Sequence, residues 1–597
     1  MIFPQAQKYI QTDGKYKVTG DYEKDSLLAF YHRIKDGNEE ITVSVNPLLG
    51  KEEYILSITP DGIKISASCD EGIYRAATSL LQIIKRQGKE LQCAVIEDKP
   101  QFERRGYMLD ISRCRMPKLS ELEKMIDFLS ALKYNEFQLY MEGDCFKYSA
   151  YPKYTESFDC LSAEDIKELD AYCRERFIDL VPNQNSLGHL APWLKYDEFK
   201  SLGLSDDKDM ADTINPLLPE SLEFVKNLYS SLLPHFKSEY VNIGLDEAFG
   251  LGKFQIEEYC KEHGKDIVFM EWLNKLNNHV KETYGKKVMF WSDMIYKSEK
   301  LYDMIPKDSV VLEWGYELIQ SQLMTEHCIA FKNAKLNYYV CPSCNTHKSF
   351  TGRADVTSFN IRTAAEIGAK YGARGLLMTD WGCGEAHPHF GVWSLVPAAL
   401  AGQYAWNIGA EQDGESFKAD FIRNAESYVD EVVFGGVKVS RLMYRMANYY
   451  LLEPERVHVG TMCGELFQFP ISQTKYAHLY DLKDCGDAFY FNNVTEYVKK
   501  VLADIEKLEF NEQLKREIIL NSRMVILSSE ICKIRIGEPV TNEEIDELIT
   551  LTDWISEEYY TLWCHRNFEK GVEEFMGYLK DRKKELTALK NERKTKK

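Results

Sequence analysis

The sequence predicts an α/β protein whose central part is a TIM (β/α)8 barrel, with a smaller domain on either side. Between residues 105 and 382 it contains eight short apolar runs, each followed by helical sequence, and eight is the number of units that closes such a barrel. The runs are apolar over most of their length, which is typical of parallel strands covered by helices. No glycine-rich nucleotide motif follows the first run, so nothing favours an open doubly wound sheet.

The expected strands and helices alternate strictly. The strands are 107–113, 136–142, 179–185, 240–247, 288–294, 309–316, 337–343 and 375–382. Helical spacing of apolar residues is found near 118–133, 162–176, 219–235, 266–284 and 298–304, and again after the last three strands. This order places one helix after each strand, as a right-handed β–α barrel requires.

The flanking sequence predicts a small α+β domain before the barrel and an all-α domain after it. Residues 52–68, "EEYILSITPDGIKISAS", read as a hairpin that turns at Pro60-Asp61-Gly62, and residues 70–88 have helical spacing. After about residue 410 only helical periodicity remains. The expected domains are 1–100, α+β; 101–408, the catalytic barrel; and 409–597, α-helical.

Composition and charge exclude several classes of partner. The 597 residues are 44% hydrophobic and 28% charged, with a formal net charge of −19, and such an acidic surface repels nucleic acid and anionic membranes. The first residues lack the apolar stretch of a signal peptide, and no run approaches the roughly 18 apolar residues of a transmembrane helix. The 15 cysteines are scattered through apolar runs. We therefore expect a cytoplasmic protein with reduced cysteines.

Carboxylates and tryptophans gather at the ends of the expected strands, where a TIM barrel builds its active site. Flat aromatic faces stack on sugar rings, and carboxylates accept hydrogen bonds from hydroxyls. The sequence therefore predicts a carbohydrate site. The polar and aromatic residues at these ends are Asp110, Arg113, Glu142, Asp144, Asn183, Asn185, His189, Asp246, Glu247, Trp291, Asp293, Glu313, Trp314, Tyr316, Tyr338, Tyr339, Asp380, Trp381 and Glu385.

Five segments at these positions resemble the signatures of one enzyme family. They read "FERRGYMLDISRCRMP", "NSLGHLAPW", "NIGLDEA", "FWSDM" and "MTDWG". In this order they resemble family 20 of the glycoside hydrolases, the β-N-acetylhexosaminidases, and the first unit resembles the small domain that precedes the barrel in that family. The resemblance covers residues 1 to about 400. The helical C-terminal part resembles that of bacterial intracellular members.

The resemblance implies an exo-acting, retaining hydrolase that releases terminal β-linked N-acetylglucosamine or N-acetylgalactosamine. In this family the substrate's own 2-acetamido oxygen attacks the anomeric carbon and forms an oxazolinium intermediate. Carried over to this chain, Glu247 is the general acid/base and Asp246 orients the acetamido group. The reaction needs no cofactor and no metal. The implied partner is an oligosaccharide or glycoconjugate with a terminal N-acetylhexosamine, and a homodimer is a further expectation.

The resemblance also implies substrate-binding residues. Arg105 matches the arginine of an Arg-Gly motif that holds ring hydroxyls, and His189 matches a Gly-His beside the acid. A tyrosine of the seventh strand is expected to bind the acetamido oxygen; Tyr338 and Tyr339 point to opposite faces, so only one can do it, and Tyr339 is preferred. The other expected residues are Trp291, Trp314 and Trp381 as walls of the sugar subsite, Asp293 and Glu385 as hydroxyl ligands, and Glu142 or Asp144 as the carboxylate that pairs with His189.

Two other catalytic hypotheses stay open at this point. A barrel glycosidase of different specificity would use Glu247 with a second carboxylate, Glu313 or Asp380. A catalytically silent barrel would bind glycans without cleaving them.

One rival motif has the spacing of zinc ligands. Cys341-Pro-Ser-Cys344 is followed by His347, and Cys383 and His387 follow the eighth strand. A zinc site there would be unrelated to the expected reaction.

Overall fold

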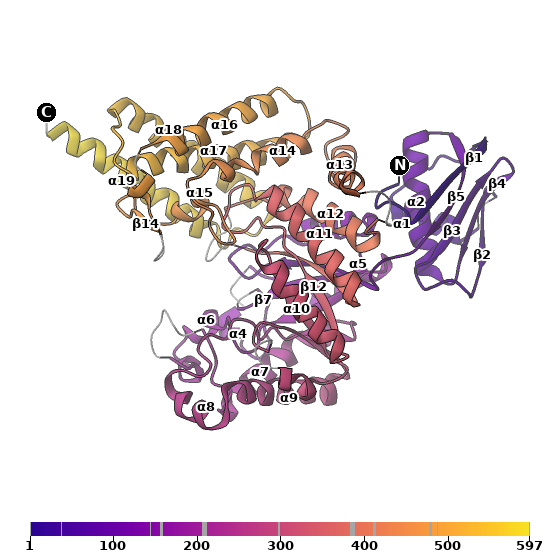
Figure 1. The fold of residues 1–597 in the computed structure, drawn as a ribbon, viewed down its shortest axis with the longest axis horizontal. Coiled ribbons are helices and arrows are strands. Elements are labelled where there is room, and N and C mark those ends of the chain that lie inside the picture. The colour runs from indigo at the N-terminus through magenta and orange to yellow at the C-terminus, as the bar shows by residue number, and fades with distance from the viewer. Residues whose placement is uncertain are drawn as a thin grey trace.

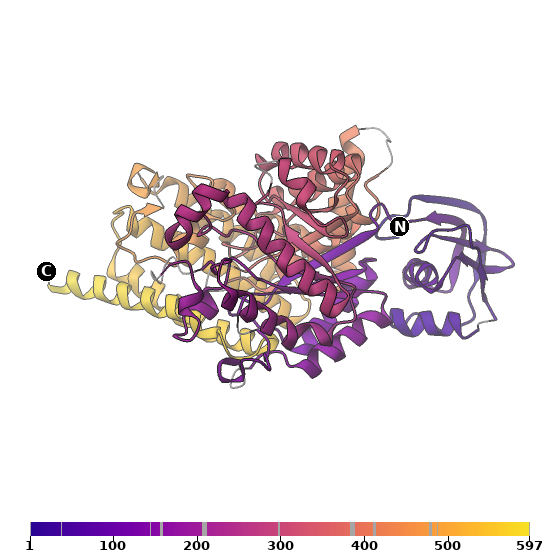
Figure 2. The same cartoon turned by 90° about the horizontal axis from the view of Figure 1, so that it is seen from below.

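The computed structural model of the protein describes residues 2–37, 39–143, 145–155, 159–205, 212–295, 299–382, 388–409, 414–476, 480–485 and 487–595. It confirms the predicted fold class: a central parallel barrel lies between an N-terminal sheet domain and a C-terminal bundle of helices (Figure 1). The last helix projects from the end of the molecule that lies away from the N-terminal domain (Figure 2). No helix among these residues is long and apolar enough to span a bilayer.

The N-terminal domain is a five-stranded sheet with two helices. The strand order is β1-β5-β3-β4-β2, and the predicted hairpin is confirmed as the antiparallel pair β3–β4, closed at Thr59 and Gly62. Helix α2 packs against β3, β4 and β5 and buries most of its length there. The elements are β1 (Lys8–Lys17), α1 (Leu27–Lys35), β2 (Ile41–Val45), β3 (Tyr54–Thr59), β4 (Gly62–Ala67), α2 (Asp70–Gln87) and β5 (Glu90–Asp98).

Eight parallel strands close into the barrel in sequence order, and each expected strand is present. The strands are β6 (Arg104–Asp110), β7 (Glu136–Met141), β8 (Asp179–Gln184), β9 (Tyr240–Asn242), β10 (Lys287–Trp291), β11 (Val310–Trp314), β12 (Asn337–Cys341) and β13 (Gly375–Asp380). The main helices between and after them are α3 (Leu119–Ala131), α5 (Ala163–Glu175), α7 (Pro219–Leu232), α9 (Lys265–Tyr284), α10 (Gln320–Asn333), α11 (Ala354–Tyr371) and α12 (Leu395–Trp406). After β10 the structure has the 3-10 segment η4 (Glu299–Met304).

The barrel interior is filled, so the site can only lie at its open end. One layered apolar cluster contains the inward side chains of the strands, among them Met108, Met289, Leu312 and Leu377. Trp314 and Trp381 lie partly buried on the edge of that cluster. Trp314 is the last residue of β11 and Trp381 directly follows β13, so the cluster ends where the predicted site begins.

Where the structure describes it, the C-terminal part is helical apart from one two-residue strand pair, β14 (Lys475–Tyr476) with β15 (Tyr480–Asp481), which the sequence did not predict. Its helices are α13 (Gly414–Val432), α14 (Ser440–Met446), α15 (Met462–Leu466), α16 (Phe489–Glu506), α17 (Glu512–Arg535), α18 (Asn542–Arg566) and α19 (Val572–Thr595). The Arg566 guanidinium at the end of α18 binds Glu517 of α17 and Glu121 of α3, each at 2.6 Å. One side chain thereby joins the helical part to the barrel.

The expected domain boundaries, 1–100, 101–408 and 409–597, stay a prediction. Strands β1–β5 lie within the first range, β6–β13 within the second and α13–α19 within the third.

Candidate active site

The two predicted catalytic carboxylates follow the shortest barrel strand. Strand β9 ends at Asn242 rather than continuing to residue 247, because Gly244, Leu245 and Glu247 adopt positive φ angles of 71°, 71° and 48°. Such a conformation costs on the order of 1–3 kcal/mol for a residue with a side chain, so the surroundings must hold it. The turn carries the Asp246 and Glu247 side chains out of the strand pattern and into the barrel mouth.

Close packing against the neighbouring strand end holds this turn. A Cβ atom on Gly244 would lie 1.6 Å from Asn185 Oδ1, and one on Gly188 would lie 2.5 Å from the Asp246 carbonyl oxygen. The Gly244 carbonyl accepts a 3.0 Å hydrogen bond from the Trp291 N–H of β10. Only glycine permits these approaches, so the two strand ends fix the position of the acidic pair.

His189 lies between the acidic pair and a third carboxylate. Its Nδ1 is 3.5 Å from Glu142 Oε1, and its Nε2 is 3.4 Å from both Asp246 Oδ2 and Glu247 Oε2. Burial alone would lower the pKa of His189, but the negative charge of Asp246, assisted by Glu247 and Glu142, raises that pKa well above its ordinary value. The imidazole is therefore positively charged at neutral pH and partly balances the carboxylates around it.

Arg113 connects the first strand to the same cluster. Its guanidinium binds Asp110 Oδ2 at 2.5 Å and Glu142 Oε1 at 2.8 Å. It also lies over the rings of Tyr140 and Trp381, 5.4 Å and 5.5 Å from their centroids. A cation held between carboxylates and aromatic faces at the barrel mouth is suited to bind ring hydroxyls.

Aromatic side chains form a wall beside the acidic pair. The ring centroids of Trp381 and Trp291 are 6.0 Å apart, and those of Trp314 and Tyr316 are 5.1 Å apart at 30°. The Tyr316 hydroxyl accepts a 2.8 Å hydrogen bond from Trp381 Nε1 and so joins the two pairs. Three strand ends thus supply one apolar wall, which fits the ring and methyl group of an N-acetyl sugar.

Asp293 lies behind the catalytic pair. Its Oδ2 accepts a 2.9 Å hydrogen bond from the Glu247 N–H, and its Oδ1 is 3.4 Å from Trp314 Nε1. Burial and the charge of Asp246 raise the pKa of Asp293 to about 7, although the two N–H groups favour its charged form. It is a carboxyl that titrates near neutral pH beside the acid.

Comparison with known families identifies the chain. The model described as "Glycosyl hydrolase family 20, catalytic domain" matches residues 102–366, and the model described as "Glycosyl hydrolase family 20, domain 2" matches residues 5–99. The chain belongs to glycosyl hydrolase family 20. The predicted family is confirmed, and the first model spans the barrel strands β6 to β12.

The chain is similar to curated family 20 proteins over part of their length. It is 25% identical over 318 residues to a β-hexosaminidase of Vibrio furnissii, which covers 47% of this chain and 51% of that protein. It is 30% identical over 229 residues to a β-hexosaminidase of Akkermansia muciniphila, and this match covers 34% of this chain and 46% of that protein. The chain spans about half the length of these relatives.

Solved family 20 structures share the fold. The Flavobacterium johnsoniae chitobiase superposes with a TM-score of 0.59 at 18% identity, covering 98% of this chain and 99% of that chain. The exo β-N-acetylglucosaminidase of Vibrio harveyi superposes with a TM-score of 0.57 at 19% identity, covering 73% and 78%. The likeness to the first extends over the C-terminal helices as well as the barrel.

The structure contradicts the prediction that Arg105 binds sugar. Arg105 is 1% exposed and stands at the amino-terminal start of β6, at the opposite end of the barrel from Asp246 and Glu247. Its guanidinium binds Glu52 of the N-terminal domain at 2.5 Å, with backbone carbonyls of Phe102 and Lys133. Arg113, at the carboxyl end of the same strand, is the arginine in the site. The signal for it was the Asp110-x-x-Arg113 spacing at the strand end.

The preference for Tyr339 is also wrong. Tyr339 points into the barrel, but its hydroxyl is 3.4 Å from Glu136, the first residue of β7, and its ring lies against Gly375, the first residue of β13. These are amino-terminal positions, so the side chain lies at the bottom of the barrel. Tyr338 faces outward and packs on Phe331 of α10. Tyr316 lies at the mouth, because β11 ends two residues before it.

The other predicted residues lie at the mouth where the structure describes them. Trp291, Trp314, Trp381, His189, Asp293 and Glu142 line it with Asp246 and Glu247. Of the two candidates for the carboxylate beside His189, Glu142 takes this position. Glu385 and Asp144 lie outside the described residues.

The alternative second carboxylates face away from the barrel interior. Glu313 binds His327 of α10 and Ser292, each at 2.6 Å. Asp380 accepts hydrogen bonds from the hydroxyls of Tyr107 and Thr346. Both carboxylates are hydrogen-bonded on the outer face of the strands, between the strands and the surrounding helices and loops. Neither is therefore directed at Glu247 across the barrel mouth.

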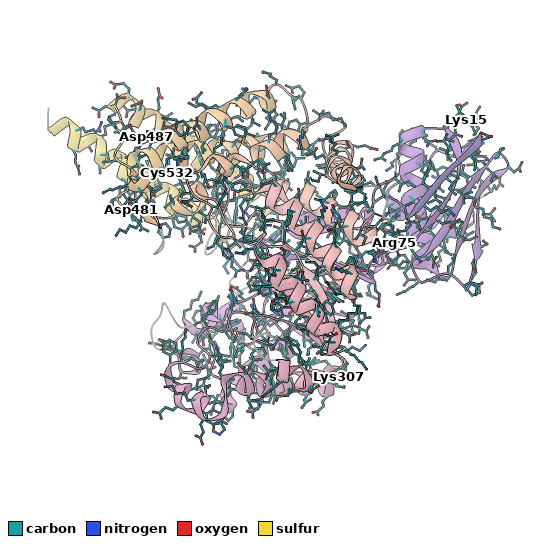
Figure 3. The ribbon with its side chains drawn as sticks, viewed as in Figure 1. Lys15, Arg75, Lys307, Asp481, Asp487 and Cys532 are labelled. Atoms are coloured by element: carbon teal, nitrogen blue, oxygen red, sulfur yellow. The ribbon has the colours of Figure 1, made fainter. Side chains whose placement is uncertain are left out.

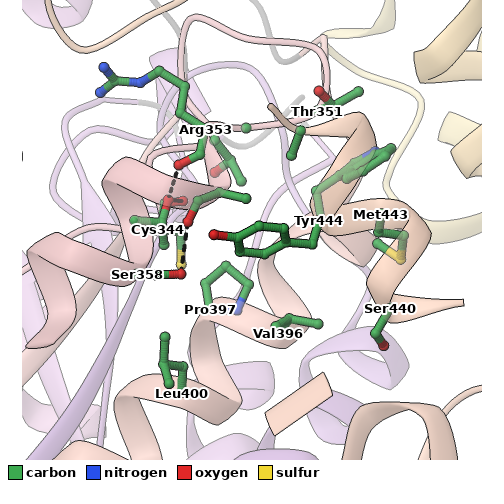
Figure 4. A pocket seen from close by; sticks show the side chains of 16 residues that line it. Cys344, Thr351, Arg353, Ser358, Val396, Pro397, Leu400, Ser440, Met443 and Tyr444 are labelled. Carbon is green, nitrogen blue, oxygen red and sulfur yellow. Dashed lines mark hydrogen bonds between the residues drawn. The ribbon is translucent and has the colours of Figure 1, made fainter. Parts of the chain in front are cut away.

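The cysteine motif does not form a converging ligand set in the described part of the chain. Cys341 lies inside the barrel cluster, whereas Cys344 lies 3.7 Å from the Tyr107 hydroxyl and borders a cavity of about 40 Å³ (Figure 4). That cavity is shared with Arg353 and with Tyr444 of the helical part. No group of three or more His, Cys, Asp or Glu side chains among the described residues is arranged to hold a metal ion, and Cys383 and His387 lie outside those residues.

Proposed function

We propose that the protein is an exo-acting, retaining β-N-acetylhexosaminidase that removes terminal β-linked N-acetylglucosamine or N-acetylgalactosamine by substrate-assisted catalysis. One observation supports this mechanism most directly. Asp246 is 6% exposed, and its Oδ1 is buried without a hydrogen-bond donor among the described residues. Because a buried carboxylate oxygen without a donor is costly, it suits a substrate N–H that arrives on binding.

The neighbouring carboxyl has the exposure that an acid/base needs. The Glu247 side chain is 38% exposed, whereas that of Asp246 is 9% exposed. Glu247 can therefore reach a leaving group and later a water molecule, while Asp246 stays beneath the sugar. Glu247 thus acts as the acid at the opening of the site, and Asp246 is the anion at its buried bottom.

The reaction follows from these positions in two steps. The acetamido oxygen bonds to the anomeric carbon, the glycosidic bond breaks, and Glu247 donates its proton to the departing oxygen. Asp246 accepts a hydrogen bond from the acetamido N–H and stabilises the positive charge of the oxazolinium ring. Glu247 then takes a proton from water as the water oxygen bonds to the anomeric carbon, and the ring opens. Two inversions give net retention.

A matched pair of substrates tests the proposal. The protein is incubated with an aryl β-N-acetylglucosaminide and with the corresponding aryl β-glucoside. We expect turnover of the acetamido substrate alone, inhibited by a thiazoline analogue of the intermediate. Turnover of the plain glucoside would instead support a two-carboxylate glycosidase, and no turnover of either would support a barrel that only binds glycans.

Cytoplasmic location and dimerisation through the helical part are further proposals that rest on the sequence. Cell fractionation tests the first, and light scattering of the purified protein tests the second. A monomer in solution would contradict the dimer.

A further inference from the structure

Asp293 contacts both the backbone of the acid and the aromatic wall. One carboxylate oxygen accepts the Glu247 N–H at 2.9 Å, and the other faces Trp314 Nε1 at 3.4 Å. Each oxygen of Asp293 is therefore already directed at a protein donor. The contacts that the structure shows for this carboxylate are thus with the protein, one donor to each oxygen.

The Glu247 backbone depends on this hydrogen bond. Glu247 has a φ of 48°, and β9 ended five residues earlier, so no strand ladder holds its N–H. The neighbouring Phe249 N–H returns to the Glu247 carbonyl at 2.6 Å, which makes a tight turn around the acid. Without the Asp293 acceptor this peptide could rotate, and the carboxyl group that it carries would move with it. A displacement of about 1 Å at a reacting group costs on the order of 100-fold in rate.

The second oxygen continues into the wall of the sugar pocket. Trp314 stacks on Tyr316, and the Tyr316 hydroxyl holds the Trp381 indole at 2.8 Å. The Asp293 carboxylate thus connects the Glu247 N–H to Trp314. Trp314 in turn contacts Tyr316, whose hydroxyl binds the Trp381 indole. The relative placement of acid and sugar wall depends on Asp293.

We propose that Asp293 is a positioning residue that holds Glu247 and Trp314 in their catalytic arrangement, and that it does not bind a sugar hydroxyl. The inference rests on the proposed function, because it assigns Glu247 as the acid. It replaces the hydroxyl-binding role that the sequence predicted for Asp293.

The charges around Asp293 give the proposal a pH signature. Asp246 and Glu247 face it from the loop after β9, and His189, Glu142 and Arg113 complete the cluster beyond them. The pKa of Asp293 is about 7, so it gains a proton as the pH falls through neutrality. The neutral acid is a weaker acceptor for the Glu247 N–H than the carboxylate, and acid placement becomes poorer at low pH.

The test compares Asp293→Asn and Asp293→Ala with the control Glu313→Gln. The control also changes carboxylate to amide, at the end of the next strand, but outside the barrel interior. Each protein is assayed on an activated aryl β-N-acetylglucosaminide and on a β-linked N-acetylglucosamine disaccharide. We expect Asp293→Ala to lose kcat on the order of 10- to 100-fold, more on the disaccharide, with little change in KM. Asp293→Asn keeps one acceptor and should lose less.

Two further readouts separate positioning from a merely structural role. Asp293→Asn should flatten the acidic limb of the kcat profile near pH 7, since it removes the titrating group. Binding of the thiazoline inhibitor should stay within a few-fold of wild type in both variants, and Glu313→Gln should match wild type throughout. Thermal melts confirm that each variant is folded.

Three outcomes overturn the inference. A raised KM with unchanged kcat would make Asp293 a hydroxyl ligand, and wild-type kinetics in Asp293→Ala would give it no role. An equal loss on both substrates with an unchanged pH profile would indicate general disruption. A wild-type protein that cleaves no β-N-acetylhexosaminide would overturn the proposed function itself, whereas the first three results require an active wild type.

Discussion

At the scale of the residue, Asp246 and Glu247 differ by environment rather than by chemistry. Both are carboxylates beside His189, yet one is buried with an oxygen that lacks a donor and the other is open to solvent. The difference arises because Glu247 turns at positive φ, which directs its side chain away from that of its neighbour. In the proposed mechanism the two adjacent residues therefore act at different parts of one sugar.

Removing the acid should discriminate between leaving groups. Glu247→Gln keeps the shape of the side chain but cannot donate a proton, so we expect losses in kcat on the order of 10²- to 10⁴-fold on unactivated glycosides. Aryl glycosides with acidic leaving groups should lose much less. Steady-state assays across a series of aryl leaving groups measure this, and a uniform loss across the series would contradict the assignment.

Neutralising the orienting anion should affect all substrates alike. Asp246→Asn presents an amide where the acetamido N–H needs an acceptor and removes the charge that stabilises the oxazolinium ring. We expect a fall in kcat on the order of 10²-fold, whatever the leaving group. The same aryl series measures it. Activity near wild type would disprove substrate assistance in this protein.

The pKa of Asp293 also predicts how stability changes with pH. Folding raises it from 3.8 to about 7, so the folded state binds this proton more tightly than the unfolded chain does. The stabilisation is complete below pH about 4 and is lost as the pH rises through about 7. Asp293→Asn should therefore lose less thermal stability than wild type between pH 5 and 7.5, as melting curves would show. Parallel curves for the two proteins would contradict the raised pKa.

At the scale of the element, the site is made by how strands end. Strand β9 stops early at Asn242, and Gly244 just beyond it has no room for a side chain, while β10 and β11 end on Trp291 and Trp314. The apolar strands form a rigid support, and the irregular residues after them set where the side chains of the site point. Backbone conformation at the strand ends is therefore part of the catalytic apparatus.

Substituting the glycine at this strand end should damage both stability and activity. Gly244→Ala would force a Cβ to within 1.6 Å of Asn185 Oδ1 at a φ of 71°, and we expect a destabilisation on the order of 3 kcal/mol. Gly285→Ala is the matched control: its φ is 65°, but nothing lies within 4 Å, so only about 1 kcal/mol is expected. Denaturant unfolding and kcat measure both. Equal losses of stability in the two variants would show that the positive φ angle, and not the contact with Asn185, causes the destabilisation.

At the scale of the whole molecule, buried ion pairs join the N-terminal domain to the closed end of the barrel. Glu52 binds both Arg105 and Arg75, and Arg75 lies where the two parts meet (Figure 3). Burial alone would raise the pKa of Glu52, but the two guanidinium groups lower it to about 2. The two ends of the barrel thus differ: Arg105 is bound in buried ion pairs at the amino-terminal end, and Arg113 lies in the proposed active site at the carboxyl end.

These two arginines should give opposite phenotypes. Arg105→Met leaves a buried carboxylate with one partner fewer, so we expect destabilisation on the order of 3 kcal/mol with KM unchanged. Arg113→Met should instead raise KM while the junction with the N-terminal domain stays intact. Melting curves and Michaelis constants measure both effects. A raised KM in Arg105→Met alone would restore the original assignment.

The sequence by itself determined the fold class, the family and the acidic pair. Hydrophobic periodicity marks strands and helices locally, and the motif at 243–248 places Asp246 and Glu247 directly after a strand. Only the tertiary structure decided between Arg105 and Arg113, and among the tyrosines. Those choices depend on how far along a strand a side chain lies and on which face it points to, and both quantities are set by barrel register. The role proposed for Asp293 likewise depends on a contact between residues 46 positions apart, which no local pattern records.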